Sequence, residues 1–148
     1  MTPSIRHPDS FGNAANPRSS VSGAFLPRSK PQTGQEWPGY IRERLMYDVK
    51  AGKKIKLTFA NTDVMPHNLL VTKPGKADAV INAAVIMGAA GFEKGFIPAS
   101  DDVLHHTKLL DMSKEEVLEF TLPTAGDYPF VCSFPGHGIL MRGVLKAK

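Results

Sequence analysis

Near its C-terminus the chain reads Cys132-Ser133-Phe134-Pro135-Gly136-His137-Gly138-Ile139-Leu140-Met141. This segment places a thiol, an imidazole and a thioether close together, and its Pro-Gly pair favours a turn between the thiol and the imidazole. The residues on either side, 126–131 and 141–146, have the composition of β-strands. We therefore expect a loop that joins two neighbouring strands at one end of a sheet and carries three candidate metal ligands.

A second histidine lies upstream in the segment Met65-Pro66-His67-Asn68, just before an expected strand at residues 69–71. Two imidazoles and one thiolate in a near-trigonal plane, with a long and weak axial thioether, form the ligand set of a copper electron-transfer site. The candidate ligands are His67, Cys132, His137 and Met141. A rigid site of this kind suits both oxidation states of copper, as fast electron transfer requires.

Together the two segments resemble the cupredoxins, the type 1 blue copper proteins, and most closely azurin and auracyanin. The resemblance extends to residues 91–98 and 103–110 and covers the chain from about Tyr47 to the C-terminus. It implies one copper ion per chain and a protein that carries single electrons between redox partners.

Two features differ from azurin. Azurin has a glycine at the position of Pro66, and the carbonyl of that glycine faces copper from the second axial side. The resemblance therefore assigns a weak axial contact to the Pro66 carbonyl. The fixed φ of proline changes the distance between this carbonyl and copper. The azurin disulfide has no counterpart, because this chain has a single cysteine.

Short segments of alternating polar and apolar residues recur from residue 45 onward and predict β-strands. The expected strands are Leu45–Val49, Lys53–Phe59, His67–Thr72, Leu104–Leu110, Glu116–Leu122, Tyr128–Cys132 and Met141–Lys146. Between Lys76 and Ile97 the apolar residues have helical spacing, so we expect a helix of about three turns that ends near Gly88 and Gly91. Roughly seven or eight short strands separated by turns indicate an all-β protein, a Greek-key β-sandwich with one helical excursion, and the resemblance implies the same cupredoxin fold.

Residues 1–40 are rich in proline and serine and show no sustained period, so we expect an irregular N-terminal arm or linker. Residues 41–148 then form the cupredoxin domain. Phe25, Trp37 and Tyr40 leave open the alternative that part of the arm lies ordered over the barrel. The first thirty residues lack the continuous apolar segment of a signal peptide. A location in the periplasm or outside the cell is implied by the resemblance alone.

Length and charge restrict the classes of partner. The 148 residues suit one domain, and no apolar run approaches the ~18 to 20 residues of a membrane span. The net charge of +4 comes from dispersed basic residues without interleaved aromatic residues, so we expect no nucleic-acid partner. The charge favours an acidic protein partner or simple solubility. We expect a monomer whose partners are redox proteins, such as a cytochrome or an oxidoreductase.

The residues around the ligands are apolar, although loop tips are normally polar. We expect them to form a docking rim around His137, through which the electron leaves. This docking rim consists of Val64, Met65, Phe134, Pro135, Gly136, Ile139 and Leu140. The alternative is that Phe134 and Leu140 point inward and cap the core.

Three other polar residues near these segments have distinct expected roles. The side-chain amide of Asn68 is expected to tie the two ligand loops together and to donate toward the thiolate. His105 and His106 are not expected to bind one metal ion, because adjacent residues of a strand point to opposite faces. One of the two should be exposed and the other half-buried.

Four ligands of this set leave no position for a substrate, so we expect an electron carrier and not an enzyme. Three alternatives remain open. In the first, the chain is the electron-transfer module of a larger oxidoreductase. In the second, it is a copper storage or delivery protein. In the third, the site holds a structural zinc ion, although a thioether is a poor ligand for zinc.

Overall fold

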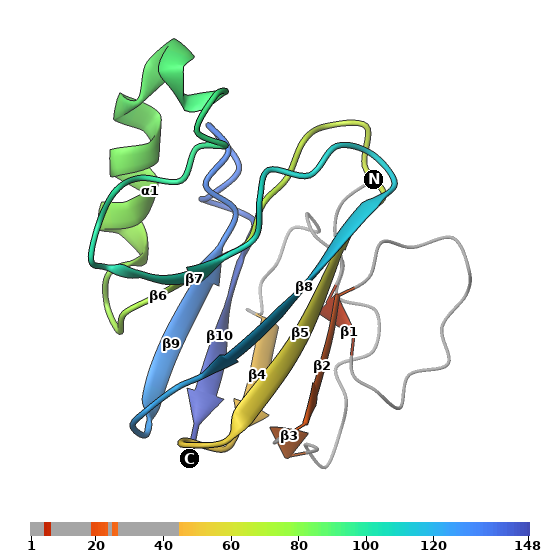
Figure 1. Cartoon of the computed structure of the whole chain (residues 1–148). Helices are drawn as coiled ribbons and strands as arrows, with labels where there is room; N and C mark the ends of the chain where they lie inside the picture. The colour runs from red at the N-terminus through yellow and green to blue at the C-terminus, as the bar shows by residue number, and fades with distance from the viewer. Residues whose placement is uncertain (1–4, 7–18, 24, 27–44) are drawn as a thin grey trace.

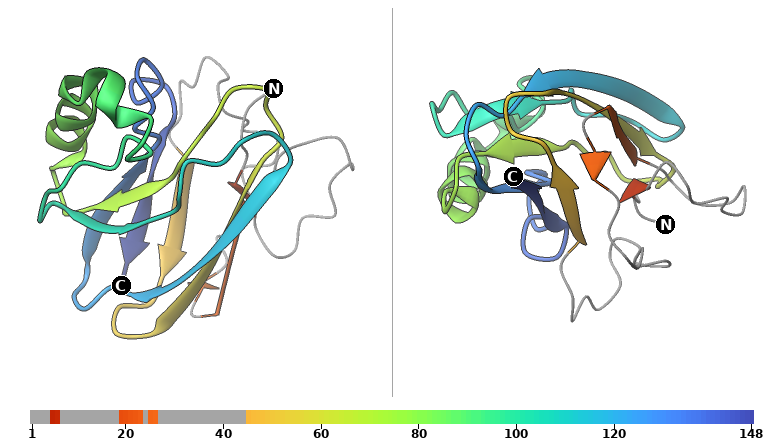
Figure 2. Two further views of the ribbon diagram at one scale, coloured as in Figure 1. Left: turned by 45° about the horizontal axis from the view of Figure 1, so that its top comes forward. Right: turned by 90° about the horizontal axis from the view of Figure 1, so that it is seen from below.

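Two β-sheets face each other and form the body of the protein (Figures 1 and 2). The computed structural model describes residues 5–6, 19–23, 25–26 and 45–148. The smaller sheet has the strand order β1-β2-β5-β8, and the larger sheet has the order β3-β4-β10-β9-β6-β7. Strands distant in the sequence are thus neighbours in both sheets. The predicted all-β sandwich with one helical excursion is confirmed.

The smaller sheet is centred on an antiparallel pair of long strands. Strand β5 (Lys54–Asn61) pairs along its whole length with β8 (Lys114–Thr121). Buried and more exposed residues alternate along β5, as they must where one face of a strand meets a core. Ile55, Leu57 and Phe59 are completely buried between the sheets.

The larger sheet positions the C-terminal ligand loop. Its strand β10 (Arg142–Ala147) pairs antiparallel with β9 (Gly126–Val131) and parallel with β4 (Leu45–Val49). The loop between β9 and β10 is closed at its base by a 2.9 Å hydrogen bond from the Cys132 N–H to the Met141 carbonyl. The predicted loop between two neighbouring strands is therefore confirmed.

Strands β6 (Leu70–Thr72) and β7 (Val103–His106) complete the larger sheet and are shorter than expected on the side that faces the ligand loop. The reason is a side chain that takes part in the pairing. Thr107 accepts the Leu69 N–H through its Oγ1 at 3.0 Å and donates its own N–H to the Leu69 carbonyl at 2.9 Å. Beyond this point only the isolated bridge between His67 and Leu110 continues the ladder.

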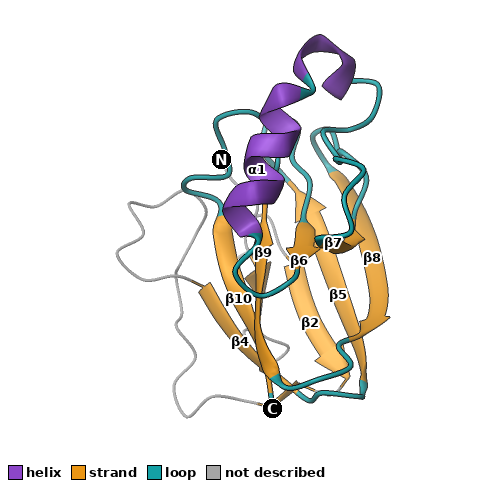
Figure 3. Cartoon of the chain, turned by 90° about the vertical axis from the view of Figure 1, so that its left-hand side faces the viewer, coloured by secondary structure: helices purple, strands orange, loops and turns teal. Residues whose placement is uncertain are grey.

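One helix covers the outer face of the larger sheet beside β6 and β9 (Figure 3). Helix α1 (Ala77–Ile86) buries Val80 in a small cluster with Val131 of β9. A 3₁₀ turn, η1 (Gly88–Gly91), follows it, so the chain leaves the helix close to the predicted end. Among the described residues, no helix has the length and apolar character needed to cross a membrane.

Three short strands in the N-terminal part join the sheets. Strand β2 (Ser19–Gly23) pairs antiparallel with β5, β1 (Ile5–Arg6) pairs with β2, and β3 (Phe25–Leu26) pairs with β4. These strands form because the edge of a sheet offers backbone groups for pairing even to a segment without an apolar pattern. The assignment of residues 1–40 as an irregular arm or linker stays a prediction. Trp37 and Tyr40 lie outside the described residues. The boundary between arm and domain stays a prediction.

The C-terminal residue lies at the end of the sandwich opposite the ligand loop (Figure 1). Lys148 donates its N–H to the Val49 carbonyl at 2.9 Å, and its carbonyl accepts the Ala51 N–H at 2.9 Å. The last residue is therefore tied into the turn that follows β4.

Candidate metal centre

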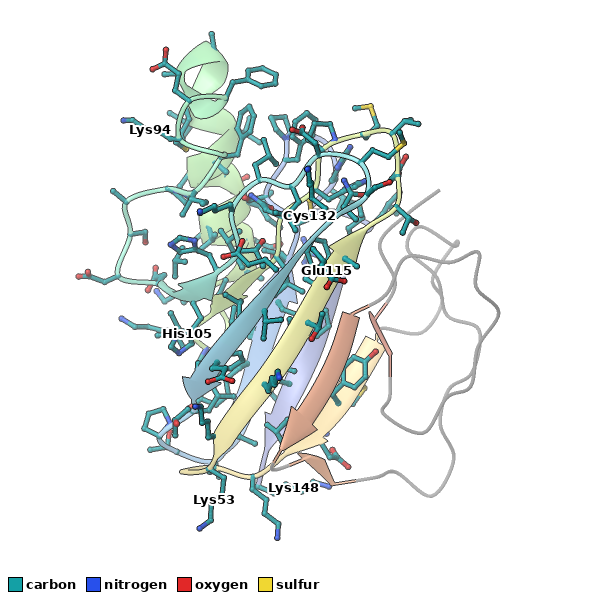
Figure 4. All side chains as sticks on the ribbon, turned by 45° about the vertical axis from the view of Figure 1, so that its right-hand side comes forward. Lys53, Lys94, His105, Glu115, Cys132 and Lys148 are labelled. Atoms are coloured by element: carbon teal, nitrogen blue, oxygen red, sulfur yellow. The ribbon has the colours of Figure 1, made fainter. Side chains whose placement is uncertain are left out.

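The candidate ligands meet at one end of the sandwich. Cys132 directly follows β9, His137 lies in the loop before β10, and His67 precedes β6. Figure 4 shows Cys132 at the end of the sheets that is opposite Lys53 and Lys148. Cys132 and His67 are buried, whereas His137 is half-buried. The site thus has an inner side within the core and an outer side at the His137 ring.

The separations of the three donor atoms fit a shared metal ion. Sγ of Cys132 lies 3.7 Å from Nδ1 of His67 and 3.8 Å from Nδ1 of His137, and the two Nδ1 atoms are 3.1 Å apart. Ligands in a trigonal plane, at metal–nitrogen and metal–sulfur lengths of about 2.0 and 2.3 Å, place their donor atoms about 3.5 to 3.7 Å apart. The two sulfur–nitrogen separations agree with these values, whereas the two ring nitrogens lie closer together than in such a plane. One thiolate and two imidazoles are the donor set of an electron-transfer copper site. Across the described residues, no other such group of His, Cys, Asp and Glu side chains converges.

Tight turns give the C-terminal loop its shape. The His137 N–H donates to the Phe134 carbonyl at 3.0 Å, and the His137 carbonyl accepts the Met141 N–H at 2.8 Å. Gly136 has a φ of +84°, in the left-handed region that favours glycine. A Cβ at Gly138 would lie 2.7 Å from the Ile81 side chain of α1, so the loop packs closely on the helix.

The fourth candidate ligand is buried in the core. Met141 is only 3% exposed and belongs to the same hydrophobic cluster as Cys132. This burial agrees with an axial position for the thioether, which stays a prediction. The axial contact of the half-buried Pro66, through its carbonyl, also stays a prediction.

His67 is fixed through both its backbone and its ring. Its N–H donates to the Leu110 carbonyl at 3.1 Å, and its carbonyl accepts the Leu110 N–H at 2.8 Å. On the ring, Nε2 lies 3.0 Å from Oδ2 of Asp63, which leaves Nδ1 turned toward Cys132. Sequence reasoning missed Asp63. The signal was an acidic residue four positions before a candidate ligand histidine, since ligating histidines commonly donate their second N–H to a carboxylate.

Asn68 joins the two loops that carry the ligands. Its Nδ2 donates to Oγ of Ser133 at 2.8 Å and to the Gly95 carbonyl at 2.8 Å, and its Oδ1 accepts the Ser133 N–H at 2.8 Å. Because both amide protons are directed at these oxygens, the side chain does not donate to the thiol as expected. The backbone N–H groups of Asn68 and Phe134 are directed at the sulfur instead.

Burial sets the protonation of the ligands. It raises the pKa of the Cys132 thiol to about 11, despite the two backbone N–H groups directed at it. Burial and the neighbouring His67 imidazole lower the pKa of His137 to about 4. Burial also lowers the pKa of His67, partly offset by Asp63. At neutral pH both imidazoles are thus neutral and able to bind a metal, whereas the thiol must lose its proton on binding.

The residues of the docking rim are largely exposed. The side chains of Val64, Met65, Ile139 and Leu140 are 72%, 44%, 75% and 51% exposed. Leu140 therefore does not cap the core. Phe134 is half-buried and packs against the core, and its ring lies 4.7 Å from that of His137, centroid to centroid. The exposed Phe92 lies next to it, at a ring-centroid distance of 6.1 Å, and was not foreseen as part of this surface.

The two adjacent histidines of β7 lie apart from the ligand group. His105 is half-buried and stacks on Phe120 with ring centroids 4.5 Å apart, whereas His106 is exposed. Their opposite orientation agrees with the expectation that they do not bind one metal ion together.

Comparison with known proteins agrees with this geometry. The family model described as copper binding proteins, plastocyanin/azurin family, matches residues 43–148. The chain is 41% identical over 88 residues to azurin of Bordetella pertussis, a match that covers 57% of this chain and 57% of that protein. It is 32% identical over 112 residues to auracyanin-A of Chloroflexus aurantiacus, covering 70% of this chain and 67% of that protein.

The fold has solved counterparts as well. A dithionite-reduced auracyanin from Roseiflexus castenholzii matches with a TM-score of 0.63 and 31% identity, over 70% of this chain and 83% of that chain. The fold and the donor set define a cupredoxin with a copper site. The chain belongs to the plastocyanin/azurin family of copper-binding proteins, and its cofactor is copper. It spans less than two thirds of the length of the Bordetella azurin, 57%.

Proposed function

We propose that the protein is a mononuclear type 1 copper protein that carries one electron at a time between redox partners. The main support is the convergence of one thiol sulfur and two imidazole nitrogens at separations of 3.1 to 3.8 Å. The Met141 thioether and the Pro66 carbonyl would complete a set of ligands that would suit both Cu(II) and Cu(I). Copper, when bound, supplies the one-electron couple.

The protein contributes a rigid frame for the ligands. The backbone of His67 is hydrogen-bonded to the backbone of Leu110, and the Asn68 side chain donates to Oγ of Ser133 and accepts the Ser133 N–H. Ligands that are held in this way move little when the charge of the ion changes. The free energy of reorganisation is therefore small, which makes electron transfer fast.

The electron leaves through His137, because its ring is the ligand that reaches the surface. The docking rim surrounds this ring with apolar side chains and carries no charge. A small apolar surface allows close approach of a partner and a short-lived complex, which suits a carrier that must dissociate after each transfer. We expect the partner to be a redox protein, a cytochrome or an oxidoreductase, and the carrier to act as a monomer in the periplasm or outside the cell.

Four protein ligands would leave no free coordination position on copper for a substrate. We therefore propose that the protein is an electron carrier and not an enzyme. Two other roles remain as alternatives. If the chain is the electron-transfer module of a larger oxidoreductase, the same site passes electrons to a second centre. If it stores or delivers copper, the ion must exchange readily with a chelator, which a site this deeply buried does not favour.

The test is the visible spectrum of the protein after addition of Cu(II). We expect one intense thiolate-to-copper band per chain, because Cys132 is the only thiol. Cys132→Ser should abolish the band, and ascorbate should bleach it reversibly in the wild type. A Cys132→Ser variant that keeps its colour contradicts the ligand assignment. Release of copper to a weak chelator within seconds would favour delivery over electron transfer.

A further inference from the structure

A buried carboxylate meets a buried imidazole behind the metal centre. Oδ2 of Asp63 lies 3.0 Å from Nε2 of His67, and both side chains are removed from solvent. The other ring nitrogen, Nδ1, faces Cys132. The imidazole thus connects a carboxylate on one side with the metal-binding position on the other.

The two oxygens of Asp63 have different partners. Oδ1 accepts the Met65 N–H at 3.3 Å, which closes a turn, while Oδ2 faces His67. The buried Asn61 holds this turn, because its Oδ1 accepts the Asp63 N–H at 2.9 Å and its Nδ2 donates to the carbonyls of Met65 and Leu110. The carboxylate is therefore fixed in position independently of the imidazole.

The surroundings of Asp63 set the direction of its hydrogen bond to the imidazole. Oδ1 accepts the Met65 N–H, and Oδ2 lies 3.0 Å from Nε2 of His67. A carboxylate oxygen accepts hydrogen bonds, so Nε2 of His67 is the donor and carries the proton.

We propose that Asp63 is a positioning residue for copper, with two effects on His67. It fixes the tautomer with a proton on Nε2, which leaves the Nδ1 lone pair for the metal ion. Its negative charge also stabilises Cu(II) more than Cu(I) and so lowers the reduction potential, since an electrostatic interaction in a buried site is weakly screened. The second effect rests on the proposed electron-transfer function, whereas the first does not.

A simpler role for Asp63 is to form the turn with Met65, and asparagine separates the two roles. An amide has one acceptor oxygen, so Asp63→Asn either keeps the turn or accepts the His67 N–H, and it carries no charge. If the oxygen stays with Met65, Nδ2 faces His67 as a donor and favours the tautomer with the proton on Nδ1. Asp63→Ala removes the charge and both acceptors.

The first measurement is the reduction potential of the copper-loaded protein. For Asp63→Asn we expect the Cu(II)/Cu(I) equilibrium to shift about tenfold toward Cu(I), which is about 59 mV for one electron. Asp111→Asn is the matched control, because it removes the same charge from an exposed side chain next to Leu110, the backbone partner of His67. Its potential should stay close to that of the wild type. Equal potentials for Asp63→Asn, Asp111→Asn and the wild type would overturn the electrostatic effect.

The second measurement needs no copper. In ¹⁵N-labelled metal-free protein, the ring nitrogen shifts of His67 should show the proton on Nε2 in the wild type and in Asp111→Asn. In Asp63→Asn and Asp63→Ala, the tautomer with the proton on Nδ1 should become populated. A wild-type His67 with its proton on Nδ1 overturns the proposal even if no variant folds. If the wild type holds Nε2–H but forms no coloured copper centre, the proposed function fails while the positioning role of Asp63 stands.

Discussion

The side chain of Asn68 and the residue next to the ligand thiol, Ser133, are joined by two reciprocal 2.8 Å hydrogen bonds, one in each direction. Ser133 is in turn bonded through Oγ to the Phe96 carbonyl at 2.6 Å. Cys132 and His67 are 65 residues apart in the sequence, and these hydrogen bonds hold the two ligand loops at a fixed separation. The ligands are therefore held in position before any ion binds.

Asn68→Ala should destabilise the protein without removing a ligand. It deletes three hydrogen bonds and leaves the buried Ser133 N–H and the Gly95 carbonyl without these partners, so we expect a loss of about 2 to 5 kcal/mol in the free energy of unfolding. Denaturant unfolding of the metal-free protein measures it. Thr124→Ala, which removes a partly exposed hydroxyl contact with Tyr128 at the other end of the fold, serves as a control and should cost less. An Asn68→Ala loss below about 0.5 kcal/mol would contradict the bracing role.

Met141→Leu should keep copper bound and raise the reduction potential. A weak axial donor stabilises Cu(II) more than Cu(I), and its removal therefore favours the reduced state. The fold should tolerate the change, since an exchange of Leu for Met in a core usually costs less than about 1.5 kcal/mol. Voltammetry is the measurement, and Met112→Leu, at an exposed methionine, is the control. If both variants have the wild-type potential, Met141 is not a ligand.

Met65→Lys should slow electron transfer without disturbing the copper spectrum. Met65 is 44% exposed and belongs to the docking rim, so a lysine there adds a charge within the proposed contact without entering the core. When two copies meet through their rims, these charges repel, and we expect self-exchange to fall by roughly tenfold or more at low salt. Val117→Lys, at a comparably exposed position on β8, is the control. Undiminished self-exchange in Met65→Lys would mean that the electron leaves elsewhere.

Copper affinity should rise with pH. The pKa of the Cys132 thiol is about 11 and that of His137 is about 4, so at neutral pH the metal displaces a proton from the thiol but none from the imidazole. One proton released per ion corresponds to an affinity that increases about tenfold per pH unit between about pH 6 and 8. Competition with a chelator of known pH dependence measures the slope. A slope of zero would mean that the thiol is already ionised in the metal-free protein or is not a ligand.

The sequence predicted the region around the ligands well because the relevant signals are local. Cys132, His137 and Met141 lie in one loop whose Pro-Gly turn and flanking strands are readable from neighbouring residues. The copper ligand set, which includes a second imidazole, then related His67 to this loop. The strands of the sandwich were also readable, since β5 alternates between buried and exposed positions along its length.

The parts that the sequence did not predict depend on pairing across long distances. Strand β2 has no alternating apolar pattern of its own, and it is a strand because it pairs with β5 and β1. The expected strand up to Leu110 stops at His106, because the Thr107 side chain replaces a backbone acceptor. The role of Asp63 becomes visible only when the turn at Asn61 brings its carboxylate to the ring of His67.

The position of the last residue has a practical use. Lys148 is anchored by backbone hydrogen bonds to Val49 and Ala51, at the end of the sandwich opposite Cys132 (Figure 4). A short tether added after Lys148 would therefore attach the protein to an electrode with its copper end facing the solution. Soluble donors could then reach His137, while direct exchange with the electrode would have to cross the length of the sandwich. Attachment through the docking rim would reverse this orientation and bring the copper site next to the electrode.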